Sequence, residues 1–214
     1  VTGVQTCALP ISAGKGMQQT DLIGKLGILV FIIVLGYESI SEAFEKIKEG
    51  QKADFYKEMA VTDTMTGVYN RSAFEEWEHE TSDYEGYSIA TFDLNNLKWC
   101  NDNLGHAAGD AYIQASVRII KEIFGRHGKC YRIGGDEFCT VINQRSKKFD
   151  IERHVKQLRE LEKYAEEELG IKGLNVQIAC GYAEYDIKTD NNFEDTRSRA
   201  DKRMYESKRI LKRE

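Results

Sequence analysis

The chain has 214 residues, of which 41% are hydrophobic and 30% are charged. This length fits one domain of ordinary size together with an additional segment. The net charge of -5 and the isoelectric point of about 5.6 argue against a general nucleic-acid-binding protein, which would normally present a basic face. A nucleotide substrate is compatible with this charge, because a few well-placed cations are enough to bind it.

The five cysteines are odd in number, contain no CxxC pair and show no regular spacing. This pattern argues against a disulfide framework and against a zinc site, and it favours a reducing compartment. The cysteines are Cys7, Cys100, Cys130, Cys139 and Cys180.

The first twelve residues, VTGVQTCALPIS, show neither a helical period nor a capping signal. We interpret residues 1–21 as a leader that is non-native, such as a cloning or assembly scar, or disordered, and we leave it out of the fold prediction. A signal peptide is the alternative. It fits poorly, because the apolar stretch is short and no basic region precedes it.

Residues 22–37 read LIGKLGILVFIIVLGY, and no polar side chain occurs between Leu26 and Leu35. The Ile, Val, Leu and Phe side chains cover every face of a helix, which is typical of a membrane span. The run is shorter than the roughly 20 residues of a full span, so a buried core helix is the alternative. We expect a transmembrane helix, with Lys25 and Tyr37 at its two interfaces.

Residues 38–60 are charged and helix-prone, with a loose apolar stripe. We interpret them as a linker helix that pairs with a second copy of itself; a solvated helix is the alternative, because the stripe is irregular. The lysines after the apolar run outnumber those before it, which places the C-terminal side in the cytoplasm, although glutamates are interleaved with them. The stripe consists of Ile40, Phe44, Ile47, Phe55 and Met59, and the lysines are Lys46, Lys48, Lys52 and Lys57 after the run, against Lys15 and Lys25 before it.

From Val61 onward the pattern changes, and we expect one folded domain over residues 61–214. Segments with helical spacing of apolar residues alternate with short apolar strands and a hairpin. This order predicts an α/β (α+β) fold, in which helices cover one sheet. The predicted helices are 72–81, 110–124, 151–169 and 192–212, and the predicted strands are 87–92, 130–133, 138–142 and 174–180.

The stretch YRIGGDEFCTVI, from Tyr131 to Ile142, places two glycines and two acids between two strands. A two-residue turn at Gly134 and Gly135 with positive φ explains both glycines. An ordinary hairpin leaves Asp136 and Glu137 unexplained.

Asp93 follows the apolar strand 87–92, at the end of a strand where ligands commonly bind. A helix N-cap at Asp93 or Asn95 is the alternative. If this strand lies beside the hairpin, Asp93 and Asp136 converge and can hold Mg²⁺ through oxygen ligands. Two such ions can activate an attacking hydroxyl and stabilise a leaving phosphate.

Two further pairs have side chains suited to a nucleotide. Asn101 and Asp110 offer the acceptors and the donor that a guanine edge requires, although a polar loop leading into an N-cap at Asp110 is the alternative. Lys208 and Lys212 share a helix face and could contact phosphates. Their alternative role is a solvated basic end that is favourable to the helix dipole.

Together these segments resemble the GGDEF family, the diguanylate cyclases, over roughly Val61 to Lys212. Four ordered blocks carry the resemblance: DTMTGVYNR (63–71), FDLNNLKWCNDNLGHAAGD (92–110), RIGGDEF (132–138) and ADKRMYESK (200–208). The resemblance implies a mainly antiparallel sheet like that of adenylyl cyclase and polymerase palm domains. It also implies that two GTP molecules are joined into cyclic di-GMP with release of two pyrophosphates, by a homodimer that holds one GTP in each protomer.

The resemblance further implies a set of site residues and a Mg²⁺ cofactor, for which Mn²⁺ can substitute. Asp93, Asp136 and the Leu94 carbonyl would bind the metal, and Asp136 with Glu137 would promote attack by the 3′-hydroxyl. The implied GTP contacts are Asn101 and Asp110 to guanine, His106 beside them, Gly134, Gly135 and Lys98 near the phosphates, and Lys208 and Lys212 on the distal phosphates. It implies a bacterial inner membrane location with this domain in the cytoplasm.

The chain departs from the family pattern at several positions. Asn95 is often Asp in the family, and Lys212 stands where many members have Arg, which keeps the charge but removes bidentate contact. The product-inhibition motif RxxD would require Arg at 125 and Asp at 128, but the residues are Gly125 and Gly128. The acid at Asp110 favours GTP alone as substrate.

Two other functions compete with the cyclase. One is a GGDEF-like module that binds GTP without turnover, although such modules usually lose motif acids that are retained in this chain. The other is a structural dimerisation domain, which requires neither the acids nor the guanine-binding residues.

Overall fold

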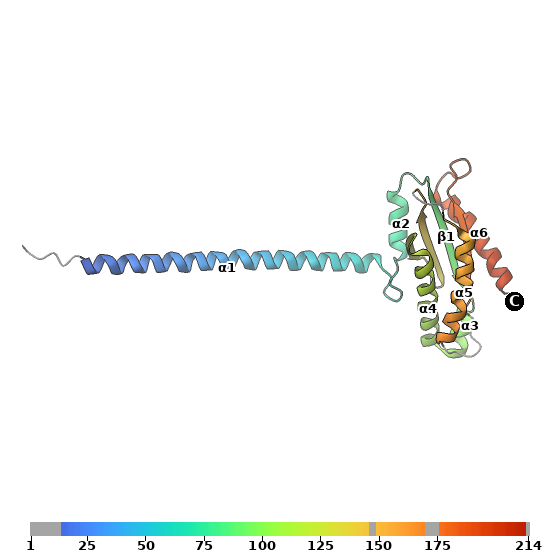
Figure 1. Cartoon of the computed structure of the whole chain (residues 1–214), viewed down its shortest axis with the longest axis horizontal. Coiled ribbons are helices and arrows are strands. Elements are labelled where there is room, and N and C mark those ends of the chain that lie inside the picture. The colour runs from blue at the N-terminus through green and yellow to red at the C-terminus, as the bar shows by residue number, and fades with distance from the viewer. Residues whose placement is uncertain (1–13, 146–148, 170–175, 213–214) are drawn as a thin grey trace, which may run out of the picture. The chain divides into compact units, whose positions relative to one another are not determined.

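The computed structural model describes residues 14–145, 149–169 and 176–212 (Figure 1). The chain forms two compact units, Val1–Tyr56 and Lys57–Glu214. Most of the predicted leader, residues 1–13, lies outside the described residues.

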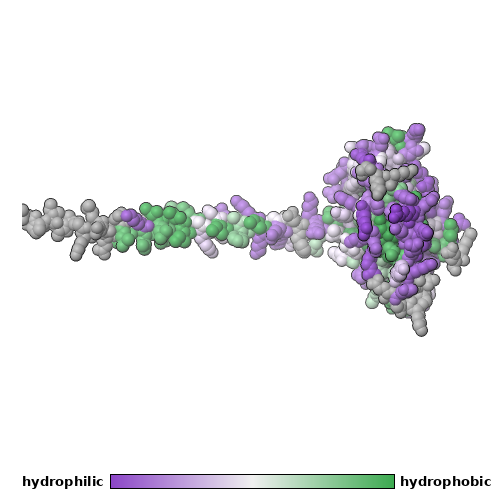
Figure 2. Space-filling view, in the orientation of Figure 1, coloured by the Kyte–Doolittle hydropathy of each residue, from purple (hydrophilic) through white to green (hydrophobic). Residues whose placement is uncertain are grey.

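Helix α1 runs without interruption over Gly14–Val61, so the predicted apolar helix and linker helix are one element. None of the apolar stretch within it is buried, and Figure 2 shows hydrophobic side chains along this part of α1. The most apolar part of α1 has a mean hydropathy of 1.9, and the helix is long enough to cross a membrane. Exposed apolar surface of this extent is unfavourable in water, so α1 has the composition of a membrane anchor.

Four strands form a single antiparallel sheet, which confirms the predicted fold class. The strands are β1 (Tyr87–Leu94), β2 (Gly128–Arg132), β3 (Glu137–Asn143) and β4 (Ile178–Glu184). Their order is β2-β3-β1-β4, and each neighbouring pair is antiparallel. Strand β1 is therefore central, with β3 on one side and β4 on the other.

Helices cover both faces of this sheet (Figure 1). Helices α2 (Arg71–Glu80) and α6 (Phe193–Leu211) pack on one face, and α4 (His106–Phe124) and α5 (Ile151–Leu169) pack on the other. The short helix α3 (Leu97–Leu104) follows β1 and packs against α4.

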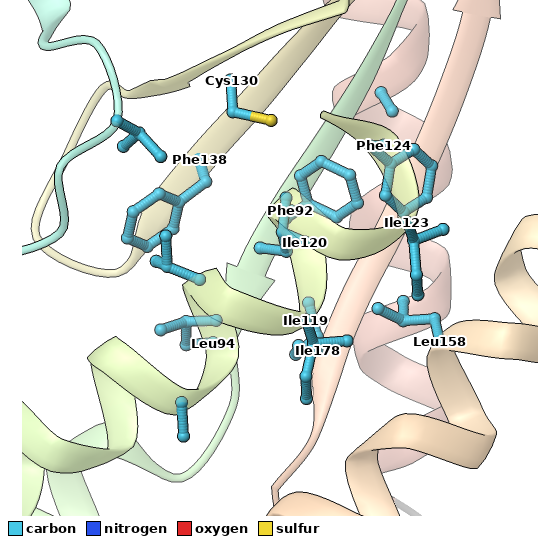
Figure 3. Packing of buried hydrophobic residues seen from close by; sticks show 14 of the residues in the cluster. Phe92, Leu94, Ile119, Ile120, Ile123, Phe124, Cys130, Phe138, Leu158 and Ile178 are labelled. Atoms are coloured by element: carbon cyan, nitrogen blue, oxygen red, sulfur yellow. The ribbon is translucent and has the colours of Figure 1, made fainter. Parts of the chain in front are cut away.

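The core is divided by the alternation of side chains along β1. Phe92 and Leu94 point into the cluster beneath α4 and α5, where the Phe92 and Phe124 rings lie 4.8 Å apart (Figure 3). Ile89 joins the cluster beneath α2 and α6. Because residues two apart share a face, Asp93 lies on the same side as Ile89, toward α6.

Two predicted elements differ most from the structure. Helix α4 begins at His106 rather than at Asp110, because only Gly105, with φ of 84°, separates it from α3. Strand β4 spans Ile178–Glu184 and so extends past the predicted end at residue 180; residues 174 and 175 of the predicted strand lie outside the described residues. Because helices cover both faces of the sheet, most residues of β4 are buried, and polar and apolar side chains do not alternate along it. The alternation used to predict this strand therefore did not mark its end.

The four cysteines in the described part of the chain are free thiols, and Cys100, Cys130 and Cys139 among them are buried. Burial raises the pKa of all four thiols, to about 12 at Cys180. They therefore stay protonated and act as small apolar core residues near neutral pH.

A substitution at Gly181 would test how closely α6 packs on the sheet. A Cβ at Gly181 would overlap the Ala200 carbonyl oxygen and the Met204 backbone nitrogen of α6. We predict that Gly181→Ala lowers the free energy of unfolding by about 1–3 kcal/mol, because helix backbone cannot move aside as a side chain can. Urea unfolding measures this change. Gly135→Ala is the matched control, since its Cβ would meet no atom within 4 Å, and an equal loss in both variants would contradict the packing argument.

Candidate active site

The C-terminal end of β1 and the β2–β3 hairpin meet at one edge of the sheet. Asp93 lies opposite Glu137 in the β1–β3 register, and the Leu94 N–H donates to the Asp136 carbonyl at 3.0 Å. The structure thus brings Asp93 and Asp136 to adjacent backbone positions. Asp93 is buried, Asp136 is half-buried and Glu137 is exposed.

The hairpin differs from the predicted two-residue turn. Four residues, 133–136, connect the strands, and neither Gly134 nor Gly135 has φ in the left-handed region. The space around them does not require glycine at both positions either. A Cβ at Gly134 would lie 2.9 Å from Glu137 Oε2, whereas a Cβ at Gly135 would project into open space.

Arg132 holds the hairpin loop in place. Its guanidinium donates to the Gly134 carbonyl at 3.2 Å and to the Gly135 carbonyl at 2.8 Å. The same group forms an ion pair with Asp63 at 3.1 Å, largely shielded from solvent. In the sequence, Asp63 and Arg132 lie in two separate motif blocks, and they were not paired in the sequence analysis. An acid without an assigned role in one block and an arginine without one in the other could have indicated this ion pair.

The Asp63 carboxylate accepts hydrogen bonds from Thr66 and Arg132. Burial alone would raise the pKa of its carboxyl group, but hydrogen bonds from Thr66 and Arg132, together with the charge of Arg132, outweigh burial and hold the pKa below its ordinary value of 3.8. The Thr66 N–H donates to Asp63 Oδ1 at 2.9 Å. The ionised carboxylate is thus the form that the fold stabilises.

Lys208 lies against Asp93 from helix α6. Its ammonium nitrogen donates to Asp93 Oδ2 at 2.7 Å and lies 2.6 Å from Oδ1 as an ion-pair contact. Oδ1 is buried and has no hydrogen-bond partner of its own among the described residues. The predicted phosphate ligand Lys208 is therefore paired with the predicted metal ligand Asp93 in this structure.

A cavity of about 420 Å³ opens beside this pair. Five of the residues expected at the site line it, namely Leu94, Lys98, Asp136, Lys208 and Lys212. Three lysines and the carboxylates of Asp102 and Asp136 around an open cavity suit a polyphosphate that carries a divalent cation.

The residues expected at guanine lie outside the lining of that cavity. Asn101 is half-buried on α3, and His106 and Asp110 are exposed on α4. The Asn101 amide oxygen lies directly over Gly109, where a Cβ would overlap it. The packing of α3 on α4 thus places Asn101 next to the residue that precedes Asp110.

The alternative helix-cap roles are wrong for these residues. Asn96, in the left-handed region with φ of 65°, precedes α3, so neither Asp93 nor Asn95 is its N-cap. Asp110 lies inside α4. Asn95 is 2% exposed, and both polar atoms of its amide are buried without a hydrogen-bond partner in the described part of the chain.

The donor set fits Mg²⁺. The Asp93 carboxylate, buried and ion-paired with Lys208, the Leu94 carbonyl and the Asp136 carboxylate are hard oxygen donors. No cluster of three His, Cys, Asp or Glu side chains suited to a metal occurs among the residues that the structure describes. Mg²⁺ commonly uses one or two carboxylates and completes its shell with water and substrate phosphates, so this pair of acids is sufficient.

The pairing of Arg132 with Asp63 generates a pH-dependent prediction. A carboxyl group whose pKa is depressed by folding contributes stability above its unfolded pKa, and that stability is lost as the pH falls through the folded value. We expect Asp63→Asn to lower the free energy of unfolding at pH 7 by about 1–3 kcal/mol, and to flatten the loss of stability in acid below about pH 4. Urea unfolding from pH 7 to pH 3 measures both effects.

Asp83→Asn is the matched control for this prediction. Asp83 also pairs with an arginine, Arg145, but both side chains are at least half exposed, so little change is expected. A variant at Asp63 that behaved like the control would show that the shielded pair does not support the hairpin.

Comparison with known proteins identifies the fold and the family. The family described as "Diguanylate cyclase, GGDEF domain" matches residues 60–213. Diguanylate cyclase DgcN of Escherichia coli is 38% identical over 39% of this chain and 21% of its own length. Cyclic di-GMP phosphodiesterase PdeB of Shewanella oneidensis is 40% identical over 39% of this chain and 10% of its own length. The chain spans less than half of the length of these curated relatives.

Solved structures agree with the fold. The coiled coil and GGDEF domain of DgcB from Caulobacter crescentus, solved in complex with c-di-GMP, has a TM-score of 0.66 at 22% identity and covers 82% of this chain and 94% of that one. Diguanylate cyclase SiaD of Pseudomonas aeruginosa, solved with its activator SiaC, has a TM-score of 0.61 at 21% identity and covers 92% and 76%. Since the family match spans more than half of the chain, this protein belongs to the GGDEF diguanylate cyclase domain family.

Proposed function

We propose that the protein is a diguanylate cyclase that condenses two GTP molecules into cyclic di-GMP and two pyrophosphates. The observation that carries this proposal is the meeting of the buried Asp93, ion-paired with Lys208, and Asp136 beside a cavity lined by three lysines. A purely structural domain requires neither the two acids nor three lysines around an open polar cavity.

Asp93, Asp136 and the Leu94 carbonyl would hold Mg²⁺ or Mn²⁺. The bound ion would lower the pKa of the attacking hydroxyl and neutralise phosphate charge. Lys208 must leave Asp93 before that carboxylate can act as a ligand, and its ammonium then becomes available to the phosphates. Lys98 and Lys212 contribute charge from the other walls of the cavity.

In each half-reaction the 3′-oxygen of one GTP attacks the α-phosphorus of the other. A new phosphorus–oxygen bond forms, the bond to the β-phosphate oxygen breaks, and pyrophosphate leaves. Asp136, with Glu137 beside it, promotes removal of the hydroxyl proton. Gly135 leaves open space at the hairpin where substrate can approach the backbone.

Guanine would be read by Asn101 and Asp110, with His106 nearby. One protomer offers a single set of these residues, so joining two GTP molecules requires a homodimer with two sites face to face. We further propose that residues 61–214 are the catalytic domain and lie in the bacterial cytoplasm. Residues 22–37 would anchor the chain in the inner membrane. Residues 38–60 would pair two protomers.

A GTP-binding module without turnover is the second candidate. It is favoured by one observation: curated relatives that match this region include proteins named as cyclic di-GMP phosphodiesterases. The close pairing of Lys208 with Asp93 is also compatible with a site that binds nucleotide but does not react.

Asp136→Ala separates these two candidates. We expect the full chain in detergent to form cyclic di-GMP from GTP and Mg²⁺, and the variant to be slower by at least about 10²-fold, because a charge-stabilising group at the reacting atoms is lost. Chromatographic separation of the products measures this rate. Asp83→Asn, remote from the cavity, serves as the control with an unchanged rate.

The outcome assigns the function. Product from wild type and none from the variant supports the cyclase. Equal rates from Asp136→Ala and wild type would refute the role of Asp136. Absence of product together with Mg²⁺-dependent protection by GTP against thermal unfolding would indicate the binding module, because a ligand that binds only the folded state raises its stability.

Gly109→Ala tests guanine recognition without removing a polar group. The added Cβ would overlap the Asn101 amide oxygen and displace that side chain. We predict roughly tenfold weaker GTP binding, equivalent to the loss of one hydrogen bond of about 1.4 kcal/mol, as measured by calorimetry. Inorganic pyrophosphate, which lacks a base, should bind both proteins equally; unchanged GTP affinity in the variant would rule out Asn101 as a guanine contact.

A further inference from the structure

A second group of polar side chains lies away from the candidate active site, between the α4–β2 turn and the start of α5. His127 and His154 approach each other there, with their Nε2 atoms 3.2 Å apart and their ring planes at 83°. They border a cavity of about 520 Å³. Neither imidazole is used in the proposed reaction.

The contacts of His154 determine which of its two ring nitrogens carries the proton when the imidazole is neutral. Its Nδ1 contacts the Asp150 backbone carbonyl, which can only accept a hydrogen bond, so Nδ1 carries the proton. The lone pair of neutral His154 is therefore on Nε2, which faces His127. Metal-binding histidines typically have this arrangement, with the other ring nitrogen donating to a backbone carbonyl.

Phe149 holds both rings in position. Its buried ring stacks on His154 at a centroid distance of 4.2 Å and meets His127 edge-on at 5.1 Å. Two imidazoles packed on one buried aromatic ring lose little further freedom on binding a ligand.

We propose that His127 and His154 bind one divalent transition-metal ion, of the class of Zn²⁺, Ni²⁺ or Co²⁺. An ion at 2.0–2.1 Å from two nitrogens that lie 3.2 Å apart subtends an angle of roughly 100°, which suits tetrahedral or octahedral ligation. Binding requires the rings to tilt so that both lone pairs converge beside the line that joins the nitrogens. His127 would bind as its neutral Nδ1–H tautomer: Nε2 releases its proton to solvent, Nδ1 takes one up from solvent, and each ring keeps one N–H.

The remaining ligands come from water. Glu122 and Glu160 line the cavity and bring negative charge, and Arg126 and Arg153 balance it. The Asp150 carboxylate already accepts a hydrogen bond from the backbone N–H of Arg153 at 3.1 Å. Since no third His, Cys, Asp or Glu joins the pair in the described residues, the site is open, and the ion would link α5 to the α4–β2 turn.

Equilibrium dialysis of the untagged full chain in detergent against Zn²⁺ or Ni²⁺ tests this proposal. Excess Mg²⁺ is included, because it occupies carboxylate sites and leaves imidazoles free. We expect one bound ion per chain in wild type and in His79→Gln, whose histidine is exposed on α2. We expect at least tenfold weaker binding in His127→Gln and in His154→Gln. Equal binding by all four proteins would overturn the proposal.

A second measurement on wild type does not depend on how the variants fold. Bound Co²⁺ shifts the proton signals of its imidazole ligands far outside the normal range. Two shifted, exchangeable N–H signals are expected, one from each ring. One such signal or none would show that the histidines form only a hydrogen-bonded pair.

Discussion

The pairing of β1 with β3 and β4 is the constraint on which the site depends. Because β1 is central, its last residues are held by hydrogen bonds from both sides, and Asp93 and Leu94 cannot shift independently of the hairpin. The Leu94 N–H fixes the Asp136 carbonyl directly. A carboxylate at the end of an edge strand would lack this support, and the positions of the two acids would not be coupled.

The same strand explains why Asp93 is desolvated. Alternation along β1 directs Phe92 and Leu94 into the core beneath α4 and α5 and leaves Asp93 on the face that α6 covers. Lys208 supplies the compensating charge, since a buried carboxylate without a partner would be strongly unfavourable. The ion pair thus compensates the buried carboxylate. Under the proposed function, its exchange for a cation would release a lysine beside the substrate phosphates.

The hairpin shows where local sequence rules were insufficient. The Gly-Gly pair predicted a tight turn with positive φ, but the loop has four residues and ordinary φ values at both glycines. Instead, the Arg132 side chain closes the loop by donating hydrogen bonds to the Gly134 and Gly135 carbonyls. Asp63, from a distant segment of the chain, holds Arg132 in place through an ion pair. A turn rule that considers only neighbouring residues cannot predict such a long-range contact.

The sequence by itself determined the family through the order of its motifs, and through that resemblance the antiparallel α/β fold. Apolar periodicity predicted most of the helices and strands, and residue chemistry singled out the acids that we propose for the site. It also indicated an apolar helix before the domain. Only the tertiary structure decided that Asp63 pairs with Arg132, that Lys208 neutralises Asp93 and that His127 meets His154. These contacts join residues from 27 to 115 positions apart, and such distances are fixed by strand register and helix packing rather than by any local pattern.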